Sequence, residues 1–175
     1  ADQAVANSTS VQIRFLAGRI YAQSGALAQA RAIAGRLAAE LQAEPQAYAK
    51  VLEGVMALEQ KDARSAVKAL TEATALLDTW IGRFDLGRAY LAAGAFPQAD
   101  SEFDRCLKRS GEAISLFLDE EPTSGFLPPV YYYQGLVRAG MQSAGFAEPF
   151  QRYLAIRQKA GDDPLLQEIR KRLAN

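Results

Sequence analysis

The 175-residue sequence contains no histidine and a single cysteine, Cys106. Without histidine, the chain cannot form a serine–histidine–aspartate triad, a histidine-ligated zinc site or a histidine general base. One cysteine cannot close an intramolecular disulfide, so the thiol content leaves the redox compartment open. Apolar stretches are short, and none approaches the roughly 18 residues of a membrane span. No charged-then-apolar signal peptide is present either, so we expect neither a span nor a secretory leader.

An excess of charge of one sign is also missing, because the 20 Lys and Arg residues are balanced by 20 Asp and Glu residues. Zero net charge argues against a dedicated nucleic-acid binder, which needs a basic surface to displace counterions from phosphates. No glycine-rich phosphate loop occurs. Ser65 and Lys68 fit the S-x-x-K pattern of a serine nucleophile, but the companion motifs are absent, so a solvated helix face is favoured. We therefore expect no enzyme, no metal and no cofactor.

Alanine is abundant, with 33 of the 175 residues. Alanine has the highest helix propensity, and small side chains let helices approach closely. Strand signals are poor, since the one dense aromatic run, 130–133, follows two prolines. The composition therefore predicts an all-α chain, and a length of 175 residues suits one domain, or a short array of repeats.

Four glycines recur inside helical patterns, and an alanine follows each of them after twelve residues. Turn candidates such as Ser24–Gly25 and Lys61–Asp62 lie between the two small residues. This spacing predicts antiparallel helix pairs in which a small residue in each helix lets the two helices pack closely. The four glycine–alanine pairs are Gly18 with Ala30, Gly54 with Ala66, Gly87 with Ala99, and Gly135 with Ala147.

The segment 83–107 resembles a tetratricopeptide repeat, whose pattern is W-x2-L-G-x2-Y followed by A-x3-F. Leu86, Gly87 and Tyr90 match the first block, whereas Ala99 and Phe103 match the second. The resemblance implies a right-handed α-solenoid of three to four helix-turn-helix repeats with a C-terminal capping helix. The expected repeats cover about residues 11–44, 47–80, 80–113 and 128–160 of one domain, 1–175, with a long connection over 111–129.

The end of the chain has the signature of the capping helix, expected over about 163–174. Asp163 can accept backbone N–H bonds as an N-cap, and Pro164 suits the first helical position. The apolar residues that follow mark one helix face, namely Leu165, Leu166, Ile169 and Leu173. A solenoid needs such a helix because its last repeat otherwise exposes an apolar surface.

The resemblance also implies that the first helices of successive repeats line a concave groove for a peptide or a partner helix. Helical spacing places nine residues in this groove: Phe15, Arg19, Tyr48, Val51, Val55, Phe84, Arg88, Tyr132 and Leu136. Phe15 and Phe84 hold equivalent positions, as do Arg19 and Arg88, and such residues are frequent interface anchors. An acidic or aromatic-bearing peptide fits this chemistry. The alternative, in which the aromatic residues pack against neighbouring repeats and the arginines are merely solvated, stays open.

These observations favour a protein–protein interaction module without catalytic activity. Two alternatives remain open. Residues 128–135 and 162–164 resemble C-terminal repeat regions of bacterial multidomain Ser/Thr kinases, which implies a regulatory segment of a larger enzyme. Exposed apolar groove residues could instead be covered by a second copy in a homo-oligomer. The start at Ala1 indicates an excised or processed chain. The sequence does not establish the location; a cytoplasmic one is favoured, and a periplasmic one is retained if Ala1 is a processed mature end.

Overall fold

The structure is a computed structural model that describes residues 8–115, 127–160 and 163–174. Every regular element in these ranges is a helix, which confirms the all-α prediction for the described residues. Residues 116–126 of the predicted connection lie outside the described residues. None of the described helices combines the length and the apolar character needed to cross a membrane.

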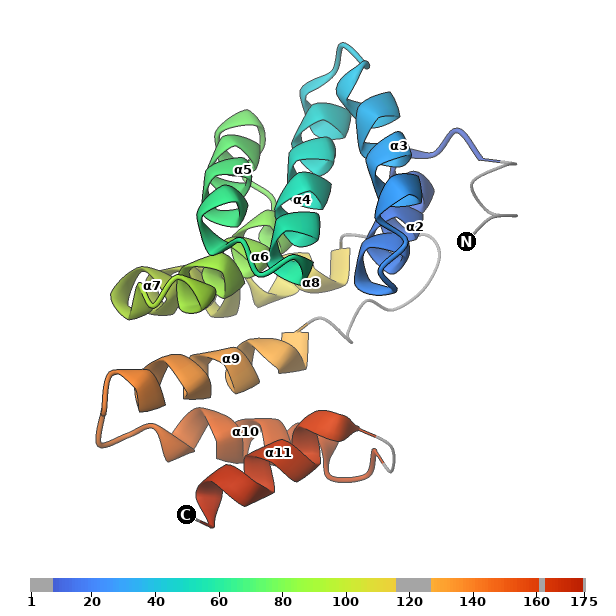
Figure 1. Ribbon diagram of the computed structural model, residues 1–175. Coiled ribbons are helices and arrows are strands. Elements are labelled where there is room, and N and C mark those ends of the chain that lie inside the picture. Colours follow the sequence, from blue (N-terminus) through green and yellow to red (C-terminus); the bar gives the residue numbers. More distant parts are fainter. Residues whose placement is uncertain (1–7, 116–126, 161–162, 175) are drawn as a thin grey trace. The chain divides into compact units, whose positions relative to one another are not determined.

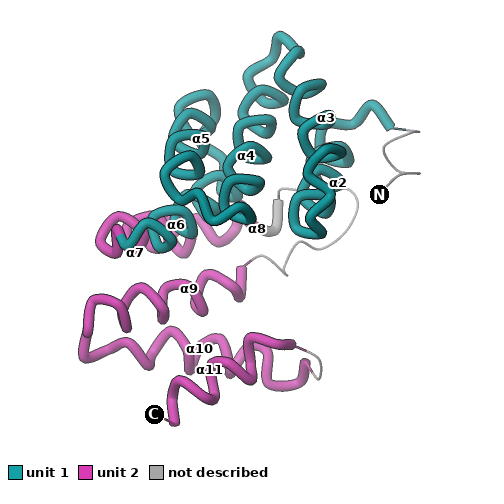
Figure 2. Tube along the Cα trace, in the orientation of Figure 1, with its two compact units in different colours: residues 1–94 teal, residues 95–175 magenta. Residues whose placement is uncertain are grey.

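The chain divides into two compact units, residues 1–94 and 95–175 (Figure 2). The division falls between the two helices of the predicted repeat 80–113, and the assignment of all 175 residues to one domain stays a prediction. Unit 1 contains α2 (Val11–Gln23), α3 (Leu27–Ala38), α4 (Ala43–Glu59), α5 (Ala63–Leu76) and α6 (Trp80–Ala92). Unit 2 contains α7 (Phe96–Lys108), α8 (Ser110–Ser115), α9 (Leu127–Gly140), α10 (Ala147–Arg157) and α11 (Pro164–Leu173).

The helices of unit 1 pack in a regular order (Figure 1). Helix α2 contacts α3 and α4, and α3 also contacts α4; in the same way α4 contacts α5 and α6, and α5 also contacts α6. Helix α4 therefore has neighbours on four sides. As a consequence it buries residues around most of its circumference, including Tyr48, Val51, Leu52, Val55 and Met56.

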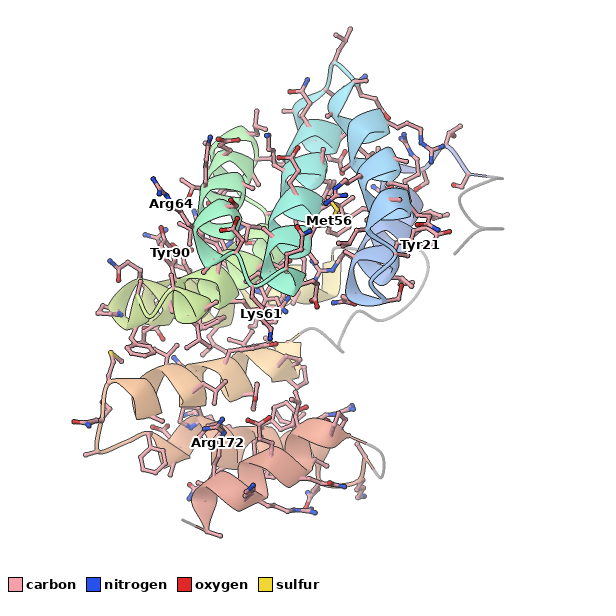
Figure 3. All side chains as sticks on the ribbon, viewed as in Figure 1. Tyr21, Met56, Lys61, Arg64, Tyr90 and Arg172 are labelled. Atoms are coloured by element: carbon pink, nitrogen blue, oxygen red, sulfur yellow. The ribbon has the colours of Figure 1, made fainter. Side chains whose placement is uncertain are left out.

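Side-chain caps and left-handed turn residues set the ends of these helices. Ser10, Asp62 and Thr79 each accept a hydrogen bond from a backbone N–H in the first turn of the helix that follows. Such caps satisfy N–H groups that have no partner within the helix. The predicted turns contain Gly25 with φ +81° and Lys61 with φ +60° (Figure 3). Glycine adopts this conformation without a Cβ penalty, whereas lysine is uncommon there.

Three of the repeated glycines, Gly18, Gly54 and Gly135, lie in close contact with large side chains. A Cβ on Gly18 would lie 2.6 Å from Leu52 Cδ1, and one on Gly54 would overlap Leu70. Gly135 in unit 2 likewise meets the ring of Phe150, 2.5 Å from a Cβ position. Each of these three glycines thus leaves space that a bulky side chain of another helix fills. The close approach of these helices at their glycines agrees with the predicted packing of small residues, and the part played by the alanines stays a prediction.

In unit 2, α9 packs against both α7 and α10, and α11 packs against α10. Helix α11 begins as predicted, because Asp163 Oδ1 accepts the backbone N–H of Leu165 at 3.0 Å. Its buried residues, Leu166 and Ile169, join an apolar cluster with Tyr132, Phe150 and Tyr153. The C-terminal helix therefore shares a core with α9 and α10.

Candidate partner-binding site

Two helices of unit 1 carry the same pair of side chains, a phenylalanine followed four residues later by an arginine. In α2, the guanidinium carbon of Arg19 lies 5.6 Å from the centre of the Phe15 ring. In α6, the guanidinium carbon of Arg88 lies 6.0 Å from the centre of the Phe84 ring. An i, i+4 spacing places both members of each pair on one helix face, where a cation–π contact is favourable. The two Phe–Arg pairs, which hold equivalent positions in the sequence, thus also have similar geometry.

Both arginines converge on one carboxylate, that of Asp85 in α6. Arg19 Nη1 forms an ion pair with Asp85 Oδ2, and Arg19 Nη2 lies 3.4 Å from Asp85 Oδ1. Arg88 Nη1 donates to Asp85 Oδ1 at 2.9 Å. The Asp85 side chain is 0% exposed and that of Arg19 is 4% exposed, whereas Arg88 retains 17%. We call these three residues the charge cluster.

The charge cluster holds Asp85 ionised and connects two helices that are distant in sequence. Burial alone would raise the pKa of Asp85, but the positive charges of Arg19 and Arg88 and their hydrogen bonds outweigh it, so the pKa lies below its usual value. The Arg19–Asp85 contact joins α2 to α6, and α4 packs against both of these helices. The cluster therefore links α2 to α6 through one carboxylate, beside the packing of both helices against α4.

Aromatic rings surround the charge cluster. The rings of Phe15 and Tyr48 have centroids 4.5 Å apart, and those of Trp80 and Phe84 stack at 5.6 Å. Burial, with a smaller effect from the Glu44 carboxylate, raises the pKa of Tyr48 to about 12. The cluster thus lies in an apolar environment that strengthens its electrostatic contacts.

The predicted groove residues of unit 1 are mostly buried. Phe15, Arg19, Tyr48 and Phe84 are at most 5% exposed, and Val51 and Val55 are fully buried in α4. The contacts described for the aromatic residues are those of core packing, the alternative that the sequence left open for them, whereas Arg19 is buried and ion-paired rather than solvated. Four residues after Arg19, Val55 and Arg88, on the same faces of α2, α4 and α6, the side chains are exposed: Gln23, Glu59 and Ala92. The partner-binding role of the buried residues stays a prediction. A partner that docks on these helix faces would first contact the exposed residues Gln23, Glu59 and Ala92.

Asp85 is the site residue that the sequence prediction missed. It is an acidic residue within the apolar stretch of α6, three residues before Arg88, and this local pair was visible in the sequence. The contact with Arg19 spans 66 residues, however, and no local pattern contains it.

A small polar cavity of about 230 Å³ lies between α4 and α5. Ser65 and Lys68, the S-x-x-K pair, line it and are exposed. Across the same cavity Lys50 Nζ lies 2.8 Å from Glu53 and 3.1 Å from Glu72, and hydrogen bonds to these two carboxylates raise the pKa of Lys50. The arrangement is that of a surface ion-pair network.

The two predicted residues of unit 2 lie in or against the apolar cluster that α11 shares. Tyr132 is 6% exposed and belongs to the apolar cluster, and Leu136 packs against that cluster. A set of polar contacts lies next to it, because Asp163 Oδ2 accepts from Tyr153 Oη at 2.7 Å and from Arg157 Nε at 3.0 Å. A helix of the same chain thus packs at Tyr132, one of the two positions that the sequence assigned to a partner.

Among the described residues no group of three or more metal-ligating side chains occurs. No family model, curated protein or solved structure matches the chain.

Proposed function

We propose that this protein is a non-catalytic interaction module built as a tetratricopeptide-like α-solenoid, which binds a peptide or a helix of another protein. The observation that carries the proposal is the order of packing in unit 1. Each helix contacts the next one, and α2, α4 and α6 also contact one another in succession. Stacked helix pairs produce this scheme because each pair buries its apolar face against the next.

The repeated Phe–x3–Arg pairs support the same proposal. They stand on α2 and α6, the first helices of the first and third predicted repeats, with the same cation–π geometry. The charge cluster supplies rigidity, since a buried and fully paired network fixes the helices that carry it. Binding surfaces on rigid helices lose little conformational freedom when a ligand docks.

The exposed ends of these helices test the proposal. Peptides selected from a displayed library on the wild-type chain would be measured against Gln23→Glu/Ala92→Glu, which adds two negative charges at the C-terminal ends of α2 and α6. The matched control, Ala38→Glu/Ala75→Glu, adds the same charges to the last turns of α3 and α5. All four residues are exposed, and the helix dipole opposes the charge equally in both variants.

The expected result is at least about tenfold weaker peptide binding by the α2/α6 variant, equivalent to ~1.4 kcal/mol, with the control unchanged. Equal weakening of both variants, or a library that yields no binding peptide, would contradict the proposal. Circular dichroism on both variants separates a lost contact from a lost fold.

A further inference from the structure

Helix α11 covers a face of unit 2 that is apolar at its centre and polar at one edge. We call this face, made of Tyr132, Leu136, Phe150, Tyr153 and Arg157, the acceptor face. Tyr132, Phe150 and Tyr153 are at most 6% exposed with α11 in place. Leu166 and Ile169 of α11 complete the apolar cluster on the other side.

Two acidic residues of α11 are recognised at the acceptor face. The Asp163 carboxylate accepts from Tyr153, from Arg157 and from the backbone N–H of Leu165, so one side chain both caps α11 and attaches it. Hydrogen bonds from Tyr153 and Arg157 offset the opposing effect of burial, and the pKa of Asp163 lies below its usual value. Five residues further on, Glu168 is hydrogen bonded to Tyr132 and accepts from Arg172 at 2.8 Å.

Helix α11 itself is a short amphipathic segment of ten residues. Isolated helices shorter than about 12–15 residues are marginal in water. Its outward residues Gln167, Arg170 and Lys171 are exposed, so the helical state of α11 depends on one apolar face and two carboxylates. These are also the features by which a groove recognises an amphipathic helix from another molecule.

We propose that the acceptor face is a binding site for an amphipathic helix of another protein and that α11 occupies it in cis as a competing ligand. The partner helix has an acidic N-cap, apolar residues three and six positions later, and an acidic residue at the fifth position. Tyr153 and Arg157 receive the N-cap, and Tyr132 receives the second acid. This proposal adds a second surface to the proposed function and depends on none of the helices of unit 1.

The tether makes cis occupancy effective. A segment joined by a short linker acts at an effective concentration in the millimolar range. A free helix with a dissociation constant of about 10 µM for the open face would then bind the wild-type chain roughly a hundredfold more weakly. Removing the apolar contacts of α11 releases this competition.

The test uses the full chain and a fluorescent, N-acetylated peptide of residues 163–174. In Leu166→Asp/Ile169→Asp, α11 can no longer dock, because both buried side chains become charged. The matched control, Gln167→Asp/Lys171→Asp, places the same residue type on the exposed side of α11. We expect the first variant to bind the peptide at least tenfold more tightly than the control or the wild type. A peptide with Asp163→Ala is expected to bind about tenfold more weakly, because it lacks the attachment to Tyr153 and Arg157.

A folded first variant that fails to bind the peptide overturns the proposal, as does equal binding by the control. Should the variant lose its helical circular dichroism, hydrogen exchange on the wild-type chain decides instead. There we expect the α11 amides to exchange at least tenfold faster than those of α9 and α10, and equal rates overturn the proposal. Exchange of α11 between copies also overturns cis occupancy; light scattering would then show a dimer for the wild-type chain and a monomer for Leu166→Asp/Ile169→Asp. None of these results changes the outcome of the Gln23→Glu/Ala92→Glu experiment, so the two proposals fail separately.

Discussion

Neutralising Asp85 should destabilise unit 1 far more than an ordinary helix substitution. Asp85→Asn keeps the size of the side chain but removes the only negative charge of the charge cluster. Arg19, with a side chain 4% exposed, then carries a buried charge whose counterion is gone. Breaking a buried ion pair on one side costs about 3–5 kcal/mol, because the remaining charge stays desolvated.

The partner substitution should rescue much of this loss. Arg19→Met in the Asp85→Asn background removes the buried positive charge, and the new amide still accepts from Arg88. Replacing a buried pair by uncharged side chains is often neutral or stabilising. We therefore expect the double variant to be more stable than Asp85→Asn alone by about 2 kcal/mol. Arg19→Met alone should cost less than Asp85→Asn, because Arg88 still pairs with Asp85.

Trp80 provides the assay. It is the single tryptophan of the chain, 1% exposed in α6 and stacked on Phe84 beside Asp85. Its fluorescence therefore reports the unfolding of unit 1. With a urea slope of about 2 kcal/mol per molar, the Asp85→Asn midpoint should fall by about 2 M. A midpoint equal to that of the wild type, or a double variant less stable than Asp85→Asn, would refute the reasoning.

The same carboxylate predicts a pH dependence. Because the pKa of Asp85 is lowered in the folded chain, its ionised form contributes stability above the ordinary value of 3.8, and this contribution is lost as the pH falls through the lower folded pKa. The gap in unfolding free energy between the wild type and Asp85→Asn should therefore be full at pH 7 and should shrink below about pH 4. A stability difference between the wild type and Asp85→Asn that grows as the pH falls would contradict this prediction.

Three further substitutions should change the stability of the chain, one by lowering it and two by raising it. Gly54→Ala should destabilise the chain by about 1–3 kcal/mol in a thermal melt, because the new Cβ overlaps Leu70. Gly35→Ala, with no atom within 4 Å of the new Cβ in the middle of α3, should stabilise it by about 0.5–1 kcal/mol; a loss there would show that α3 is not helical at this point. Asp100→Asn should raise the melting temperature at pH 7 but not at pH 3, since burial and the neighbouring Asp104 raise the pKa of Asp100 and make its ionised form unfavourable in the fold. An equal effect at both pH values would reject that explanation.

The helices and their turns were largely predictable from local chemistry. Alanine-rich amphipathic stretches, the Asp163–Pro164 start and the left-handed Gly25 each act within a few residues. The sequence indicated that helices approach each other closely at these glycines, but it did not indicate which side chain contacts each glycine. A glycine in a helix indicates a tight contact, yet Gly54 meets Leu70 because of the rotation of α5 about its axis, and spacing alone does not give this rotation.

The candidate site was harder to predict, because burial depends on neighbours that are remote in sequence. Val51 and Val55 follow the predicted groove register, but α4 is surrounded by four helices and both side chains are buried. Likewise, Arg19 and Arg88 were recognised as equivalent, whereas their common acceptor Asp85 depends on the approach of α2 to α6. Contacts between distant helices are a property of the tertiary fold, which periodicity does not encode.

The burial of Cys106 has a practical consequence. Its thiol is 1% exposed inside α7, and maleimide reagents need an accessible thiolate. An engineered surface cysteine can therefore be labelled selectively without replacing Cys106. A spin label placed at Lys171, on the outward side of α11, would report the tumbling of that helix directly and follow its release when a competing peptide is added.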